Sequence, residues 1–272
     1  MSLKPFEESA DYVQSLVRGL RVLRAFDREF SSPTLSQVAE RTGLSRAVAR
    51  RSLLTLQHLG YVGSRDRSFF LTPRVLELGY SYLSSLDLTE LAQQSMEHLA
   101  QRVGESCSMS VLDGNDIVYV LRVPVRRVMS LALGVGVRLP AFAASMGRVM
   151  LADLPDAALA AWLGAQKFRT YTPQTICTAS ALKVEILRVR KQGYALVVRE
   201  LDPGLCSIAV PIRASDGHVV AGLNVAMPYN KDVPVRAVKQ VLPALRDAQQ
   251  VIEQAIRHSG WLPQVAMRSA YE

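Results

Sequence analysis

The chain has 272 residues, 49% of them hydrophobic and 21% charged, and a formal net charge of +8. This composition is typical of a globular protein with room for two domains, and it excludes an intrinsically disordered chain. No apolar run approaches the ~20 residues of a membrane-spanning helix, and residues 1–12 contain acids and no apolar core, so we expect a cytoplasmic protein.

Residues that usually hold metals or form disulfides are few and scattered. The three cysteines, Cys107, Cys177 and Cys206, lie far apart and form no CxxC pair, so we expect reduced thiols. The four histidines have no partner at metal-ligand spacing. The sequence therefore predicts neither a metal site nor a cofactor.

Residues 12–30 predict an amphipathic helix that follows a loose arm at residues 1–10. Apolar residues recur on one side at helical spacing, and four arginines occupy the other side. The apolar side is wider than packing on a small domain requires, so part of it should stay uncovered.

The stretch Thr34–Val62 predicts two short helices joined by a tight turn. Thr34 can cap the first helix, and Gln37 can reach back to the backbone N–H of the cap, which makes a capping box. Gly43 suits the left-handed end of that helix, and Ser45 can cap a second helix that begins one residue later.

The second helix of this pair has an apolar side and an arginine-rich side. The apolar stripe consists of Ala49, Leu53, Leu56 and Leu59. Three arginines, Arg46, Arg50 and Arg51, lie on the other side, where guanidinium groups could contact guanine edges or phosphates in a major groove. An ordinary solvated helix face is the alternative interpretation.

A β-hairpin wing is predicted after this helix. Tyr61–Val62 and Ser68–Leu71 have the composition of short strands, with a polar turn at Arg65–Arg67. Between Arg41 and Arg74 there are seven arginines and one acid, a local charge of 7 − 1 = +6 that favours a polyanion.

We therefore interpret residues 10–71 as a winged helix-turn-helix and residues 1–71 as a DNA-binding domain. The expected DNA contacts lie on the second helix and the wing: Ser45, Arg46, Ala47, Arg50, Arg51, Arg65 and Arg67.

Residues 72–86 predict a linker helix, because Thr72 can cap it and Pro73 can occupy its first turn. A second helix at 87–104 follows almost at once, so the domain boundary is expected near residues 84–87.

Residues 87–260 predict a mixed α+β domain with an antiparallel sheet, followed by a tail at residues 261–272. The expected strands are a hairpin within 107–123 that turns at Asp113–Asn115, then 128–133, 194–198, 206–211 and 218–225. The expected helices are 145–154, 156–163, 180–192 and 232–258.

The order and the amino-acid sequences of these segments resemble those of the IclR family of bacterial transcription regulators. The resemblance runs from about Asp11 to His258, and it is carried by the helix-turn-helix and by LPAFAASMGRVMLA (139–152) and GYALVVRELDPGLCSIAVPI (193–212). It implies a GAF-like effector-binding domain and dimerisation that involves the first helix. The wording is similar in particular to the branch that controls protocatechuate, 4-hydroxybenzoate and β-ketoadipate catabolism.

The same resemblance implies an effector pocket. Its expected residues are Val128, Leu131, Leu139, Ser145, Met146, Val197, Ser207, Asn224 and Ala226. Arg199 departs from the acidic or amide groups that the family often has nearby; it could pair with a ligand carboxylate or simply be solvated. Arg122, Arg126, Arg127 and Arg138 are further candidates that the sequence does not separate.

Two polar residues of this set suggest the chemistry of the ligand. At a helix start, the Ser145 hydroxyl and the free backbone N–H groups after it could bind a carboxylate, although Ser145 could also be only an N-cap. Asn224 lies in an apolar strand, where an unpaired amide would cost roughly 1–3 kcal/mol, so it needs a partner.

Other functions fit the sequence less well. The stretch Ala143–Gly147 is one glycine short of the G-x-S-x-G nucleophile elbow, with Asp202, Asp216 and His218 following, but Pro140 interrupts the strand that should precede it. A DNA-binding regulator without a ligand is a second alternative. Our interpretation is a non-enzymatic regulator that binds palindromic operator DNA as a homodimer or pair of dimers and responds to a small carboxylate, either an aromatic acid or a compound resembling β-ketoadipate.

Overall fold

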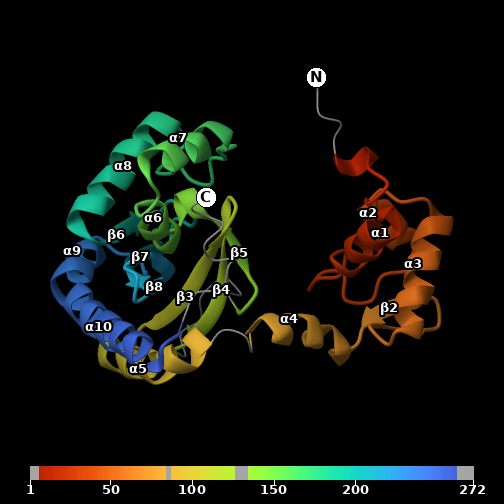
Figure 1. Cartoon of the computed structure of the whole chain (residues 1–272), viewed down its shortest axis with the longest axis horizontal. Helices are drawn as coiled ribbons and strands as arrows, with labels where there is room; N and C mark the ends of the chain where they lie inside the picture. The colour runs from red at the N-terminus through yellow and green to blue at the C-terminus, as the bar shows by residue number, and fades with distance from the viewer. Residues whose placement is uncertain (1–5, 84–86, 126–133, 262–272) are drawn as a thin grey trace. The chain divides into compact units, whose positions relative to one another are not determined.

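The computed structural model describes residues 6–83, 87–125 and 134–261, and the chain forms two compact units, Met1–Ser84 and Ser85–Glu272 (Figure 1). None of the described helices combines the length and apolar character that crossing a bilayer requires.

The N-terminal unit is a helical domain with a small two-stranded sheet. Its elements are η1 (Phe6–Glu8), α1 (Gln14–Leu23), α2 (Leu35–Thr42), α3 (Arg46–His58), β1 (Val62–Arg65), β2 (Ser68–Leu71), η2 (Pro73–Val75) and α4 (Leu76–Leu83). Strands β1 and β2 pair antiparallel around a turn at Asp66 and Arg67. The predicted winged helix-turn-helix is confirmed.

Local signals set the turn between α2 and α3 as predicted. The Thr34 side chain accepts from the Gln37 backbone N–H while the Gln37 side chain accepts from the Thr34 backbone N–H, so the capping box is present. Gly43 has the left-handed φ of 66°, and the Ser45 hydroxyl accepts from the Val48 N–H at 3.4 Å. These bonds satisfy backbone groups that helix ends leave free.

Two expectations for this unit are wrong. The first long helix ends at Leu23 and not near residue 30, because the Asp27 carboxylate accepts from the backbone N–H groups of Glu29 and Phe30 and stabilises a turn instead. Leu59 lies beyond the end of α3 and is 47% exposed, so only the other three residues of the expected stripe are buried.

The C-terminal unit combines one sheet with helices on both faces. Its helices are α5 (Asp87–Val103), η3 (Ala141–Ala143), α6 (Ser145–Leu151), α7 (Asp156–Ala165), α8 (Ala179–Gln192), α9 (Val233–Arg236), the π-turn η4 (Ala237–Val241) and α10 (Leu242–Ser259). Its strands are β3 (Ser106–Asp113), β4 (Asp116–Val123), β5 (Arg138–Pro140), β6 (Ala195–Val198), β7 (Leu205–Arg213) and β8 (Val219–Pro228).

These six strands form one antiparallel sheet in the order β5-β4-β3-β8-β7-β6. The β3–β4 hairpin turns at Gly114 and Asn115, as predicted. Strand β5 differs from the expectation that Pro140 interrupts a strand here. Pro140 instead ends a short edge strand, where a missing N–H is tolerated. The strand expected at 128–133 lies outside the described residues.

The helix expected at 232–258 is interrupted. A π-turn, η4, separates α9 from α10 just before Pro243, which has no N–H to continue the helical hydrogen bonds.

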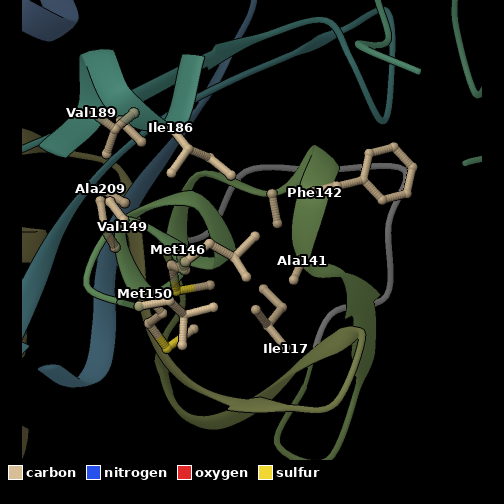
Figure 2. Close-up of a cluster of buried hydrophobic side chains, with 14 of the residues drawn as sticks. Ile117, Ala141, Phe142, Met146, Val149, Met150, Ile186, Val189 and Ala209 are labelled. Carbon is tan, nitrogen blue, oxygen red and sulfur yellow. The ribbon is translucent and has the colours of Figure 1, made fainter. Parts of the chain in front are cut away.

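Each face of the sheet packs against different helices. Cys107 points to one face, where its thiol lies 3.1 Å from the Met96 carbonyl of α5, and α10 packs beside α5 (Figure 1). Helix α6 lies on the opposite face, between the sheet and α8. Met146 and Val149 of α6 are buried there with Ile186 of α8 and Ala209 of β7 (Figure 2).

Two glycines allow α6 to approach its neighbours closely. A Cβ atom on Gly147 would lie 2.1 Å from the Ala141 carbonyl oxygen, and one on Gly222 would lie 2.8 Å from the Met146 Cβ. Backbone on both sides leaves no room for a methyl group, so these glycines fix the position of the start of α6.

We predict that Gly147→Ala destabilises the protein by about 2–4 kcal/mol. The new methyl group would collide with the Ala141 backbone, so α6 would have to move away from η3 and lose packing contacts. The matched control is Gly164→Ala in α7, where the new Cβ would meet nothing within 4 Å. This variant should be neutral or more stable by up to about 1 kcal/mol. Urea unfolding of both variants measures the difference, and equal stabilities would contradict the packing role of Gly147.

Candidate functional site

The exposed face of α3 carries the predicted DNA contacts. Arg46, Ala47 and Arg50 are exposed on this helix, and Ser45, also exposed, uses its hydroxyl to cap it. On the hairpin, Arg65 and Arg67 are exposed on either side of Asp66, whose φ of 56° forms the turn. The unit thus presents an arginine-rich helix and an arginine-rich wing tip.

The seven arginines of this region divide into two groups. Arg41 forms an ion pair with Asp27 and lies over the Phe30 ring, and Arg74 forms an ion pair with Glu77. The other five have no ion-pair partner within the described part of the chain: Arg46, Arg50, Arg51, Arg65 and Arg67. Their charge is therefore available to an anionic partner.

An apolar groove of about 650 Å³ runs along α1, α3 and α4. It includes Leu16, Leu20 and Leu78, which are 61%, 47% and 51% exposed. Arg51 borders this groove, whereas Arg46 and Arg50 do not line it. Uncovered leucines at this density mark a surface suited to a protein partner.

The C-terminal unit contains a cavity of about 190 Å³ between the sheet and the start of α6. Its lining is mostly apolar, with a few polar groups from separate elements. The lining residues are Tyr119, Leu139, Pro140, Ala144, Ser145, Met146, Tyr171, Leu201, Leu205, Ser207, Asn224 and Ala226.

Six of the predicted effector residues line this cavity: Leu139, Ser145, Met146, Ser207, Asn224 and Ala226. Val197 is buried opposite Ser207 in the sheet but does not reach the cavity. Arg199 does not line it either, because its guanidinium donates to the Pro203 carbonyl at 3.1 Å and lies over the Tyr229 ring. Val128 and Leu131 lie outside the described residues.

Ser145 has a different role from the N-cap considered above. It is the first residue of α6, and Ala144 occupies the cap position without a side-chain bond. The Ser145 hydroxyl lies 2.9 Å from the Ser207 hydroxyl of β7. Each hydroxyl keeps hydrogen-bonding capacity beyond this bond, so the pair can also bind a ligand.

Asn224 is the one lining residue with a buried, unsatisfied polar atom. Its side chain is 4% exposed, and its Oδ1 atom has no hydrogen-bond partner among the described residues. Such a group costs roughly 1–3 kcal/mol unless something occupies the cavity and bonds to it. The Asn224 side chain therefore still needs a hydrogen-bond partner, and a molecule in the cavity can supply it.

Tyr119 is a second polar group on the wall. It is 4% exposed, and no hydrogen bond joins its hydroxyl to another described residue. Burial raises the pKa of Tyr119 to about 12, and the positive charge of Arg122 opposes this rise. The phenol thus stays neutral near pH 7 and can donate a hydrogen bond.

A buried ion pair fixes the walls around these groups. Arg148 of α6 donates to both carboxylate oxygens of Glu200, at 2.8 and 2.6 Å, and to the Phe142 carbonyl at 2.8 Å. Glu200 also accepts from the Ile176 N–H at 3.0 Å. Helix α6, η3 and the segments that carry Tyr171 and Leu201 are therefore held together.

The structure separates some of the candidate arginines. Arg138 forms ion pairs with Asp113 and Asp116 on the β3–β4 hairpin. Arg122 is half-buried, donates to the Ser108 hydroxyl at 3.2 Å and has no ion pair within the described ranges. Arg126 and Arg127 fall outside those ranges.

The residues of the hydrolase alternative do not assemble around Ser145. Asp202 and Asp216 each accept a backbone N–H two residues ahead, from Gly204 and His218, and so stabilise turns. The His218 ring is 65% exposed beside Asp153, and no described histidine contacts the Ser145 hydroxyl.

The sequence prediction missed half of the cavity wall: Tyr119, Pro140, Ala144, Tyr171, Leu201 and Leu205. Pro140 and Ala144 lie within the family-like stretch 139–152 and could have been found there. Tyr171 belongs to a turn whose Thr172 and Thr175 hydroxyls donate hydrogen bonds to the Glu200 carbonyl. No local sequence pattern predicts these bonds.

Comparison with known proteins agrees with both units. A family model described as the C-terminal part of bacterial transcriptional regulator IclR matches residues 80–254, and one for the IclR helix-turn-helix domain matches residues 15–66. The chain is 39% identical over 244 residues to the Pca regulon regulatory protein of Pseudomonas putida, which covers 89% of this chain and 84% of that protein.

Two further relatives come from other bacteria. The p-hydroxybenzoate hydroxylase transcriptional activator of Acinetobacter baylyi is 37% identical, over 87% of this chain and 89% of its own length. An IclR homologue of Microbacterium hydrocarbonoxydans, solved in complex with 4-hydroxybenzoate, is 27% identical with a TM-score of 0.78, over 90% of this chain and 100% of that chain. The chain belongs to the IclR family of transcriptional regulators, which are not enzymes.

Proposed function

We propose that this regulator controls an aromatic-acid catabolic operon and that a small carboxylate in the cavity changes its affinity for operator DNA. The observation that carries the proposal is the cavity with the unpaired Asn224 side-chain oxygen on its wall. In a regulator without a ligand, this unpaired group would lower the stability of the protein and serve no function.

The size of the cavity supports a ligand with one ring. Its volume, about 190 Å³, is below the ~300–1,000 Å³ of sites for drug-sized ligands. It exceeds the ~150 Å³ of a protein cavity that holds benzene. A ring with one or two polar substituents fits, and the relatives named for the Pca regulon and for p-hydroxybenzoate hydroxylase support an aromatic acid. A short dicarboxylate such as β-ketoadipate is the second candidate.

DNA binding is assigned to α3 and the wing. Arg46 and Arg50 would contact bases or phosphates in the major groove, with Ser45 and Ala47 beside them, and Arg65 and Arg67 would contact the backbone from the wing. Arg51, which borders the apolar groove, would contribute less than the sequence suggested.

The apolar groove on the N-terminal unit favours assembly as a homodimer or a pair of dimers. Its exposed leucines belong to α1, to α4 and to the residue that follows α3, and a second copy would bury them. Two recognition helices in successive major grooves would then lie roughly 34 Å apart on a palindromic site.

We predict that Asn224→Leu abolishes effector binding and stabilises the ligand-free protein by about 1–2 kcal/mol, because it removes an unsatisfied amide without reducing volume. Calorimetric titration with 4-hydroxybenzoate, protocatechuate and β-ketoadipate measures the first effect, and urea unfolding the second. Ser145→Ala should weaken binding about tenfold.

The control for this experiment is Cys107→Ala, which removes a buried thiol from the α5 side of the same sheet, outside the cavity lining. It should leave effector affinity within about twofold of the parent. Unchanged affinity in the double variant Ser145→Ala, Asn224→Ala would show that the cavity is not the effector site.

We also predict that Arg50→Ala weakens binding to a duplex that the parent protein selects from a random DNA pool. If Arg50 contacts a base, the expected loss of binding free energy is about 1–3 kcal/mol. If it contacts a phosphate, the slope of log affinity against log salt concentration should fall by about one. Fluorescence anisotropy at several salt concentrations measures both. Arg257→Ala, which removes the same charge from an exposed position of α10, should bind like the parent. Parental binding by Arg50→Ala would refute the assignment of α3.

A further inference from the structure

The effector cavity has a mostly apolar wall with a few polar groups, and no charged side chain lines it. None of its lining residues is ionisable near pH 7, and the charge of the buried Arg148 guanidinium is already paired with the Glu200 carboxylate. A carboxylate that enters a protein interior without a counter-charge loses most of its hydration energy and binds poorly. If the effector is an acid, a cation close to the cavity must compensate it.

The sheet register places such a cation in the same row as the unpaired amide. Ser108 of β3 lies opposite Arg122 on β4 and opposite Asn224 on β8. Directly opposite residues of an antiparallel sheet project from the same face, and neighbouring strands are about 4.8 Å apart. Because the Arg122 guanidinium reaches the Ser108 hydroxyl, at 3.2 Å, it spans one of the two strand spacings that separate Arg122 from Asn224.

A β-bulge makes this arrangement. The β3–β4 register shifts between Met109 and Ser110, so that Met109 pairs with Leu121 but Ser110 pairs with Tyr119. In a regular strand Tyr119 and Arg122, three residues apart, would point to opposite faces. The extra residue, Val120, brings both to the cavity face, which is a recognised use of bulges beside binding sites.

Two observations indicate that Arg122 is available. It is half-buried, yet no carboxylate lies at ion-pair distance within the described ranges, whereas Arg138 nearby is paired with two aspartates. Its charge also acts on the wall of the cavity, because it opposes the burial-induced rise in the pKa of Tyr119.

We propose that Arg122 supplies the positive charge that selects carboxylate effectors, and that the carboxylate lies at the Asn224 end of the cavity. This inference rests on the effector role proposed above. The Ser145–Ser207 hydroxyl pair then faces the opposite end of the ring, where it can bind a ring hydroxyl. Arg122 is thus a specificity-determining residue, and Asn224 and Tyr119 complete the carboxylate contacts.

The test compares each acid with its neutral amide. The parent protein, Arg122→Met and Arg122→Lys are titrated with 4-hydroxybenzoate and protocatechuate, and with the corresponding primary amides, which keep the shape but carry no charge. We expect the parent to prefer each acid by at least tenfold. Arg122→Met should weaken acid binding about 10- to 100-fold and amide binding less than threefold, since charge-assisted bonds are the stronger ones.

Arg122→Lys should recover much of the acid preference, because it restores the charge without the planar fork. The matched control is Arg138→Met, which removes a paired arginine from the neighbouring edge strand and should not alter the acid-to-amide ratio. Thermal unfolding checks that each variant is folded.

The outcomes separate the two proposals. Failure of the parent to bind 4-hydroxybenzoate, protocatechuate and β-ketoadipate would contradict the effector role itself. If Arg122→Met binds the acid as tightly as the parent does, only the role of Arg122 is overturned. The same holds if the substitution weakens acid and amide binding equally. If Arg122→Met fails to fold, the acid-to-amide ratio of the parent and of Arg122→Lys decides: a parent that prefers the amide contradicts the proposal.

Discussion

The buried ion pair between Arg148 and Glu200 is the constraint on which the C-terminal unit depends. Arg148 is 1% exposed, and each member of the pair also bonds backbone, so neither charge is left uncompensated. Removing one partner of such a pair typically costs about 3–5 kcal/mol, because the other charge remains buried. Since the pair joins α6 to the Phe142 carbonyl and to the loop before β7, it holds the start of α6 above the sheet and keeps the cavity open.

Two polar groups that face the cavity, the Asn224 side-chain oxygen and the Tyr119 hydroxyl, have no hydrogen-bond partner among the described residues, whereas the Ser145 and Ser207 hydroxyls bond each other. The Asn224 amide and the Tyr119 hydroxyl come from different strands, and each would be more stable if it were paired or replaced by an apolar group. A fixed scaffold with unsatisfied groups lowers the entropy cost of binding, because the ligand meets donors and acceptors that are already in place. The unsatisfied groups lower the stability of the ligand-free protein, and a ligand whose polar atoms bond to them is favoured over one that lacks those atoms.

Elements with local signals were predictable from the sequence, whereas contacts across the sheet were not. The capping box at Thr34, the left-handed Gly43 and the Ser45 cap define the helix-turn-helix within about a dozen residues. By contrast, the Ser145 hydroxyl bonds Ser207, which is 62 residues away, and neither of the two roles that the sequence suggested for Ser145, carboxylate binding or an N-cap, includes this contact. The bulge that turns Tyr119 toward the cavity breaks the alternation on which strand prediction relies, and Pro140 hid an edge strand.

The central claim is that occupancy of the cavity and affinity for DNA are coupled, and reciprocity tests it most directly. If 4-hydroxybenzoate or another acid changes operator affinity by some factor, operator must change the affinity for that acid by the same factor. Anisotropy with and without the acid, and calorimetry with and without operator, measure the two factors. Linkage requires the two factors to be equal, so their agreement checks the measurements. The account predicts a factor that differs from one in the parent and no coupling in Asn224→Leu. An acid that binds the parent without changing operator affinity, or that still acts on operator binding by Asn224→Leu, would contradict it.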